Sequence, residues 1–251
     1  MVFIRRTMTN KTSYLLLCSA LLIRCIVPRP SVETIRQAEK INLSKQNLNQ
    51  IPTSIFSNKN LKSLRLYKNN LTHLPPDIGK LSSLEELYIG KNQLKKLPDE
   101  ICDLKNLKIL SIQYNQLGKL PDSIGKLKNL EQLILNQNRI KRLPQNIGSL
   151  DKLEVLQLNW NKLDSLNEAL YNCINLRYLK LRQNDIRSIS PSLSRLQNLI
   201  EMDISNAGFA IQVPESICEM RKLEYLFVDP ITQLPNCLLV RQRTKIVVTR
   251  N

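Results

Sequence analysis

Residues 130–152 read LEQLILNQNRIKRLPQNIGSLDK, and this stretch is one copy of a unit that recurs along most of the chain. Its opening, L-x-x-L-x-L, is typical of a short strand. Its end, L-P-x-x-I-x-x-L, is typical of a turn followed by a short helical or extended return. One such unit cannot bury its own apolar edge, whereas a row of units buries a continuous core. The stretch therefore predicts a repeat protein.

Equivalent units begin at nine positions, and the first eight beginnings are spaced by 23 residues. The last step is 24 residues, because repeat eight carries one extra residue near Gly208. We expect an array of about nine repeats over residues 38–238, in which the extra residue is either a binding feature or a tolerated insertion. The units begin at Ala38, Leu61, Leu84, Leu107, Leu130, Leu153, Leu176, Leu199 and Leu223.

The first 30 residues differ from the array. Arg5, Arg6 and Lys11 precede the apolar run Tyr14–Ile23. This run is shorter than the about 20 residues that a membrane-spanning helix needs, but its basic flank resembles a secretory signal. Residues 1–30 are therefore expected to be an export signal, which would place the protein outside the cell or in its envelope, or an unstructured leader of a cytoplasmic protein.

The two ends of the array are expected to be capped. Residues 31–40, SVETIRQAEK, predict a short helix that begins at a Ser cap and covers the first repeat. Residues 239–251 are basic and contain the strand-like stretch KIVVT, so they predict a terminal cap or tail.

The repeat pattern is fullest in LRLYKNNLTHLPPDIGKL, LYIGKNQLKKLPDEICDL, LSIQYNQLGKLPDSIGKL and LILNQNRIKRLPQNIGSL. These units closely resemble the leucine-rich repeat family, in the form that ends L-P-x-x-I-G-x-L. That form is seen in Ras-binding scaffold proteins, plant intracellular Ras-group repeat proteins and many bacterial repeat proteins. The resemblance implies an α/β solenoid shaped as a horseshoe, with a parallel sheet on the concave face and short helical, 3-10 or extended segments on the convex face. It implies a scaffold role, possible in signalling, only weakly, because one fold hosts many functions.

Composition narrows the functional classes. The net charge is +16, which favours acidic partners, anionic surfaces or nucleic acid, or else reflects a solvated lysine-rich exterior. Cys102, Cys173 and Cys218 fall inside repeats and no C-x-x-C occurs. The cysteines are therefore expected to be small core residues rather than a disulfide or zinc framework.

One column of asparagines shares a single offset in six repeats. A side-chain amide both donates and accepts, so a stack of amides can satisfy backbone groups where the chain leaves each strand. The predicted structural ladder is Asn69, Asn92, Asn115, Asn138, Asn161 and Asn184.

The candidate site is the concave face. Side chains alternate along a strand, so the residues between the core leucines point outward. Seven of the 12 aromatic residues fall in these columns, and exposed Tyr and Trp beside Arg are typical of binding hot spots. The predicted partner-binding residues are Arg65, Tyr67, Lys68, Tyr88, Lys91, Tyr114, Trp160, Tyr178, Lys180 and Arg182.

Nine strands at about 4.8 Å spacing make a face roughly 40 Å long, which suits a folded protein or a long peptide better than a small molecule. Its first third is basic, and Glu201, Asp203 and Asp229 make its far end acidic. No phosphate loop, nucleophile elbow or H-E-x-x-H occurs, so we expect no enzyme, no cofactor and no small-molecule substrate. The first hypothesis is a monomeric scaffold or interaction module that binds another protein. The alternative is a basic envelope or surface protein that binds anionic polymer, lipid headgroups or nucleic acid by charge.

Overall fold

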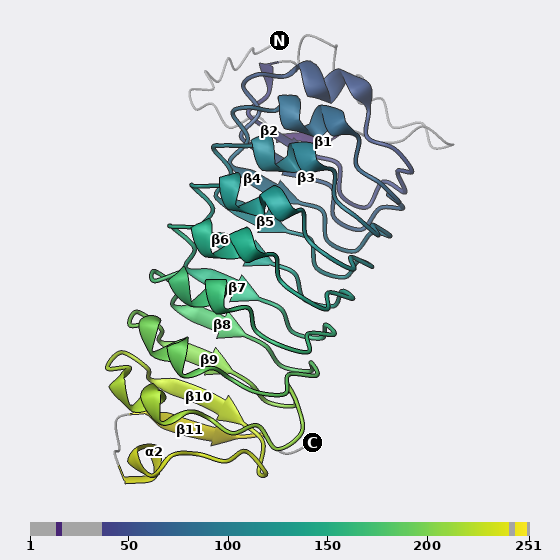
Figure 1. The fold of residues 1–251 in the computed structure, drawn as a ribbon. Helices are drawn as coiled ribbons and strands as arrows, with labels where there is room; N and C mark the ends of the chain where they lie inside the picture. The colour runs from purple at the N-terminus through teal and green to yellow at the C-terminus, as the bar shows by residue number, and fades with distance from the viewer. Residues whose placement is uncertain (1–13, 17–36, 241–243, 250–251) are drawn as a thin grey trace, which may run out of the picture.

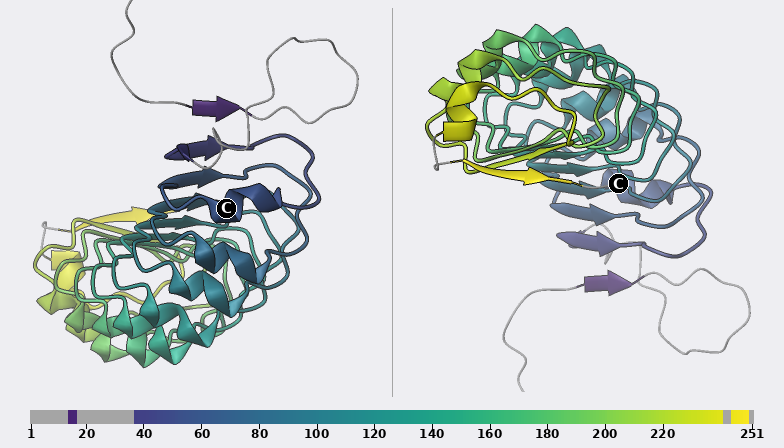
Figure 2. Two further views of the ribbon diagram at one scale, coloured as in Figure 1. Left: turned by 90° about the horizontal axis from the view of Figure 1, so that it is seen from above. Right: turned by 90° about the horizontal axis from the view of Figure 1, so that it is seen from below.

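The structure is a computed structural model that describes residues 14–16, 37–240 and 244–249. These residues form a solenoid in which each full turn contributes one strand and one short helix (Figure 1). The strands make one 11-stranded parallel sheet whose order follows the chain. Figure 2 shows the sheet along one side of the solenoid and the helices along the other. The predicted solenoid with a parallel sheet is confirmed.

The strands are three or four residues long and most helices are five-residue 3-10 helices. The strands are β1 (Tyr14–Leu16), β2 (Lys40–Asn42), β3 (Ser63–Arg65), β4 (Glu86–Tyr88), β5 (Ile109–Ser111), β6 (Gln132–Ile134), β7 (Val155–Gln157), β8 (Tyr178–Lys180), β9 (Glu201–Asp203), β10 (Tyr225–Val228) and β11 (Lys245–Val248). The helices are η1 (Thr53–Ser57), η2 (Pro76–Lys80), η3 (Asp99–Asp103), η4 (Asp122–Lys126), η5 (Gln145–Ser149), η6 (Glu168–Asn172), η7 (Pro191–Arg195), η8 (Glu215–Glu219) and α2 (Asn236–Val240).

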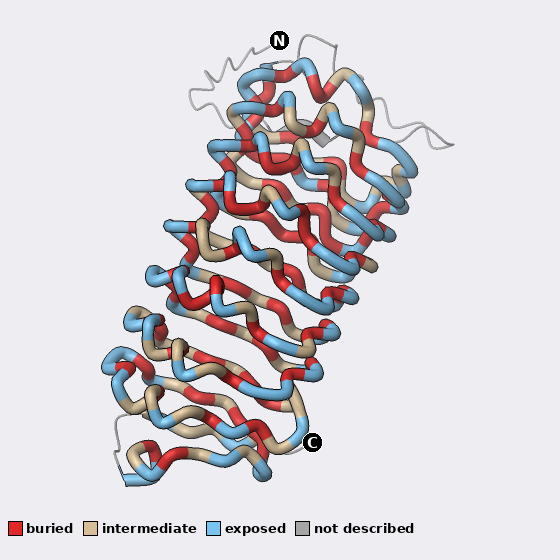
Figure 3. The backbone as a smooth tube through the Cα atoms, viewed as in Figure 1, coloured by how far each residue is buried: buried red, intermediate tan, exposed pale blue. Residues whose placement is uncertain are grey.

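The core is a stack of leucine and isoleucine rows inside the solenoid (Figure 3). In β6, Leu133 is fully buried and pairs in register with Leu110 of β5 and Leu156 of β7. Ile147 of η5 closes the same turn from the helical side and is also fully buried. Each such side chain contributes about 1.5–3 kcal/mol when it leaves water. The repeat period of the sequence is therefore the stacking period of the core.

A column of prolines immediately precedes six of the eight described 3-10 helices, namely η1 to η5 and η8. Pro144 precedes η5 with φ −69°, a value that the proline ring imposes. The column lapses at Asn167 and Ser190, which hold the same position with φ −67° and −70°. Here the side-chain oxygens accept hydrogen bonds from the backbone N–H groups of Ala169 and Ser192. An ordinary N-cap thus replaces proline where proline is missing.

The structure changes the expectation for the N-terminal end. Within the leader expected over 1–30, Tyr14–Leu16 form β1, which pairs in parallel with β2, and the other residues lie outside the described part. Within the helix expected over 31–40, residues 31–36 also lie outside that part. Gln37 is helical, but Lys40 already belongs to β2, so the predicted helix end is wrong. The reason is that Ile41 must enter the sheet to join the buried strand row, where it pairs with Leu64.

The cysteine prediction is half right. Cys102 and Cys173 are free and buried, and the Cys173 thiol donates to the Ile147 carbonyl oxygen at 3.3 Å. Cys218, however, is not a simple core residue, because it forms a disulfide with Cys237. The truncated ninth repeat folds into α2 rather than another 3-10 helix, and this brings the two Cα atoms to 6.0 Å. The KIVVT stretch forms the expected strand, β11.

Two buried groups that can lose a proton, the Cys173 thiol and the Tyr171 hydroxyl, predict that the folded protein becomes less stable at high pH. Burial raises the pKa of Cys173 and of Tyr171 to about 12, whereas exposed Cys and Tyr titrate near pH 8.5 and 10. Above those values the unfolded chain releases protons that the folded chain keeps, so stability falls as pH rises. Each group contributes a slope of up to about 1.4 kcal/mol per pH unit. Urea unfolding across this range should show the fall, and Cys173→Ala should reduce its slope; an equal slope in both proteins would contradict the assignment.

The extra residue of repeat eight lies where the asparagine ladder lapses. Ala207 stands where the ladder has asparagine, so no side-chain amide is present. The Ile186 N–H instead donates to the Ala207 backbone carbonyl at 2.5 Å, whereas the equivalent Leu163 N–H donates to Asn184 Oδ1 at 3.0 Å. The chain must come inward for this bond, and a Cβ on Gly208 would overlap the Ile186 carbonyl oxygen. The extra residue therefore coincides with the place where a backbone carbonyl replaces the ladder amide.

Gly208→Ala should lower the free energy of unfolding by about 1–3 kcal/mol, because the new Cβ forces backbone apart. Gly118→Ala is the matched control, since a Cβ there meets nothing within 4 Å. That variant should be neutral or slightly stabilising. Equal unfolding midpoints for the two variants would show that the close approach at Ile186 is absent.

Candidate functional site: the concave face

The centre of the concave face is an apolar floor. Ile109 of β5, Ile134 of β6 and Val155 of β7 are half-buried on the solvent side of the sheet. The register places Gln132 between Ile109 and Val155, and Ile134 lies two positions further along β6, so the three apolar side chains are diagonal neighbours around Gln132. The three lie at outward positions between the core leucines, but they are not among the ten predicted partner-binding residues. Their signal was that β-branched residues interrupt otherwise polar columns.

A rim of turn residues borders this floor where the strands end. The residue before each ladder asparagine adopts a positive φ, with values of 58° at Tyr114 and 53° at Trp160. The same applies to Lys68 and Lys91, at 57° and 58°. Each strand therefore ends before these four residues and the chain turns there, although all four side chains are exposed.

The backbone of the rim residues is strained, and hydrogen bonds to the next repeat hold it in place. Bulky residues rarely adopt positive φ, which costs about 1–2 kcal/mol per residue. Backbone bonds to the next repeat fix the turn, with Tyr114 N–H donating to the Asn136 carbonyl and Trp160 N–H to the Arg182 carbonyl, at 2.9 and 2.8 Å. The two side chains keep 44% and 45% of their surface exposed. The rim thus presents two aromatic rings to solvent in a fixed backbone.

Cations stack on aromatic rings along the face. The Arg65 guanidinium lies 4.8 Å from the Tyr88 ring centre, and that of Arg182 lies 5.6 Å from the Trp160 ring. The Lys180 ammonium lies 5.0 Å from the Phe227 ring. Such pairs contribute about 0.5–1 kcal/mol at exposed sites and limit side-chain freedom before a partner arrives.

The carboxylates at the acidic end of the face already have partners within the protein. Glu201 forms an ion pair with Lys180. Asp203 accepts from the Ser205 hydroxyl at 2.6 Å, and Asp229 accepts from the Asn206 N–H at 2.7 Å. Lys180 therefore offsets the charge of Glu201, whereas Asp203 and Asp229 keep their negative charges and are held in place by hydrogen bonds from neutral groups.

The ten predicted partner-binding residues fall into two groups on either side of the floor. Arg65, Tyr67, Lys68, Tyr88 and Lys91 lie on the second and third repeats. Trp160, Tyr178, Lys180 and Arg182 lie on the sixth and seventh, with Tyr114 between the two groups. Phe227, whose ring lies near the Lys180 ammonium, belongs beside the second group; it is one of the seven aromatic residues of the outward columns but is not among the ten predicted residues.

The asparagine ladder lies directly beneath the rim. All six side chains are 6–8% exposed. Asn138 is typical: its Oδ1 accepts from the Leu117 N–H at 3.0 Å, and its Nδ2 donates to the carbonyls of Ile112 and Leu135, both at 3.0 Å. Each amide therefore ties its own repeat to the preceding one and supports the strained rim residue next to it.

Within the described ranges, no helix is long and apolar enough to cross a membrane. The same ranges contain no cluster of three or more His, Cys, Asp or Glu side chains suited to a metal ion.

Residues 39–174 match the family described as "Leucine-rich repeat region". The chain belongs to the leucine-rich repeat family. A comparison with curated protein sequences finds no match. The family and its fold commonly mediate protein–protein interaction and are typically non-catalytic binding modules.

Solved leucine-rich repeat structures resemble the chain. A leucine-rich repeat protein of Leptospira interrogans is 26% identical with a TM-score of 0.63, and the match covers 88% of this chain and 68% of that one. An internalin, InlF, of Listeria monocytogenes is 19% identical with a TM-score of 0.76, covering 88% and 63%. The ectodomain of the Arabidopsis thaliana receptor kinase GASSHO1/SCHENGEN3, solved in complex with CASPARIAN STRIP INTEGRITY FACTOR 2, is 30% identical with a TM-score of 0.70, covering 81% and 25%. The chain thus spans a quarter to two thirds of the length of these proteins.

Proposed function

We propose that the protein is a non-catalytic interaction module that binds another protein on the concave face. The observation that carries the proposal is the apolar floor of Ile109, Ile134 and Val155 between two half-exposed aromatic rings, Tyr114 and Trp160. A central apolar area with aromatic and Arg anchors and a polar surround is the composition of a binding hot spot.

Rigidity supports the same proposal. The rim residues are fixed by backbone bonds and the cations by their rings, so a partner would order few side chains on binding. The plant receptor ectodomain that resembles this chain was solved with a bound factor, which agrees with a macromolecular partner. A scaffold role in signalling is the finer form of the proposal and rests on the sequence resemblance alone.

The test is affinity capture from the extract of the source organism, with the whole chain as bait. Tyr114→Ala with Trp160→Ala should lose a specific protein partner, or weaken it at least about 30-fold if each ring contributes about 1 kcal/mol or more. Ile174→Ala with Phe209→Ala is the matched control, because these exposed side chains, at 57% and 90%, lie away from the floor. A partner retained equally by both variants would place the interaction elsewhere.

A further inference from the structure

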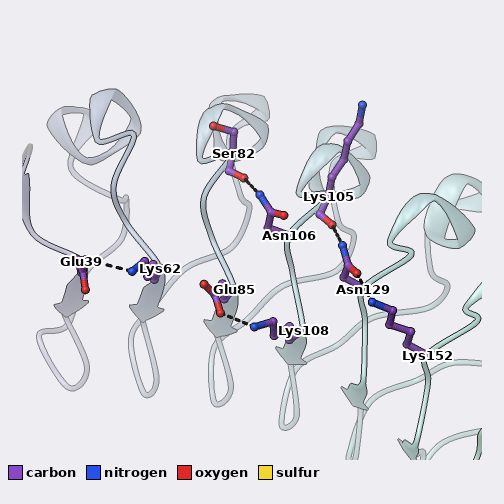
Figure 4. A network of polar contacts seen from close by, with 9 residues as sticks. All are labelled: Glu39, Lys62, Ser82, Glu85, Lys105, Asn106, Lys108, Asn129 and Lys152. Atoms are coloured by element: carbon purple, nitrogen blue, oxygen red, sulfur yellow. Dashed lines mark hydrogen bonds and ion pairs between the residues drawn. The ribbon is translucent and has the colours of Figure 1, made fainter.

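Charged side chains are paired differently at the two edges of the solenoid. At the N-terminal ends of the strands, cations pair with carboxylates of neighbouring repeats (Figure 4). Lys62 Nζ lies 3.1 Å from Glu39, Lys108 Nζ lies 2.8 Å from Glu85, and Lys128 Nζ lies 3.2 Å from Asp151. On this edge the charged side chains form ion pairs between neighbouring repeats.

The opposite edge, at the C-terminal ends of the strands, carries more cations than carboxylates. The segments 66–75, 89–98, 112–121 and 135–144 contain no Asp or Glu. Among the described residues, only Arg142 of this edge has an ion pair, at 3.5 Å from Asp164. We call these exposed side chains the basic edge: Lys68, Lys91, Lys95, Lys96, Lys119, Arg139, Lys141 and Arg142.

Part of the basic edge forms a regular row. Lys96, Lys119 and Arg142 share one offset in successive repeats, so they recur roughly every 5 Å along the solenoid. A hollow of about 880 Å³ runs across three repeats beside this row and is lined by His73, Lys96 and Lys119. Asp99 and Asp122 line it from the helical side, with Lys126 next to them. The row continues past these carboxylates to Arg142.

We propose that the basic edge binds the sugar–phosphate backbone of a single-stranded nucleic acid, laid along the solenoid and held by charge without base reading. Evenly spaced cations complement a polymer with evenly spaced phosphates better than an acidic protein surface. Lysine suits this role because it is a flexible point charge. A hollow that crosses repeats admits a flexible single strand, whereas a planar lipid surface cannot enter it.

The proposal goes beyond concave-face protein binding and is tested separately. A fluorescent oligothymidylate is titrated with the whole chain at several salt concentrations, and anisotropy gives the affinity. Lys96→Gln, Lys119→Gln and Arg142→Gln together should weaken binding and reduce the slope of log affinity against log salt by about 2, since each phosphate contact contributes about 0.7. Tyr114→Ala with Trp160→Ala should leave this binding unchanged.

The control triple is Lys62→Gln, Lys108→Gln and Lys128→Gln, which removes the same charge from the opposite edge. It should keep the wild-type slope. Equal losses in both triples would mean that net charge alone attracts the strand, and the basic edge would not be a site. Absence of salt-dependent binding would also overturn the proposal. So would binding of phosphatidylserine-rich vesicles, but not of the oligonucleotide, because the edge would then be a lipid surface.

Discussion

Asn138→Ala should lower the free energy of unfolding by about 3–5 kcal/mol. The substitution removes three hydrogen bonds of 3.0 Å and a longer one of 3.5 Å to the Asn136 carbonyl oxygen, and it leaves the Leu117 N–H buried without its side-chain acceptor. The buried unsatisfied Leu117 donor costs about 1–3 kcal/mol, and the two lost 3.0 Å bonds to the Ile112 and Leu135 carbonyl groups cost about 1 kcal/mol each in addition. Urea unfolding followed by circular dichroism measures the change.

Asn146→Ala is the matched control. Its amide makes one exposed bond, to the Asp122 carbonyl at 2.9 Å, so its loss should cost less than about 1 kcal/mol. If Asn138→Ala costs no more than this, the ladder does not stabilise the array.

The ladder also predicts coupling between repeats. The Leu135 carbonyl accepts from both Asn138 and Asn161, each at 3.0 Å. Either single variant leaves this carbonyl one amide donor, whereas the double variant leaves it none. The double variant should therefore cost more than the sum of the singles, by about 0.5–3 kcal/mol. Strict additivity would show that the amides act independently.

The repeat period determined most of what could be predicted from sequence. A fixed offset says which side chains stack, so the strand row of Leu133, the ladder and the 3-10 segments all follow from it. The period does not say where a strand stops. Trp160 looked like an outward strand residue, but the ladder amide beside it turns the backbone to positive φ. That turn depends on hydrogen bonds between neighbouring repeats, and the sequence of a single repeat does not reveal them.

The ends of the array were harder to predict for the same reason. The pairing of Cys218 with Cys237 depends on α2 replacing a ninth 3-10 helix, and a broken pattern says only that the regular geometry ends. Likewise, the concave floor consists of ordinary strand residues whose importance comes from their neighbours in adjacent turns. Contacts across irregular repeats are therefore where structure adds most to sequence.

Reducing the Cys218–Cys237 disulfide should destabilise the C-terminal unit by about 3 kcal/mol. The bond closes a loop with a sequence separation of 19, and cross-links of this length contribute about that much by restricting the unfolded chain. The helix α2 contributes little core, because Leu238 is its only buried residue, while Leu239 and Val240 are 66% and 80% exposed. Because α2 buries so little apolar surface, it depends on the covalent link to the neighbouring helix η8.

The loss should be local, because each turn of a solenoid contacts only its neighbours. Reductant should speed amide exchange in β10, β11 and α2, while exchange in β4 to β7 stays unchanged. Cys218→Ser with Cys237→Ser should reproduce this pattern and abolish the response to reductant, which separates the disulfide from the buried thiols of Cys102 and Cys173. Unchanged exchange at the C-terminal end after reduction would mean that the packing of η8 against α2 holds the cap without the bond. A loss spread over all repeats would instead show that the array unfolds as one cooperative unit, with the cap closing its whole core.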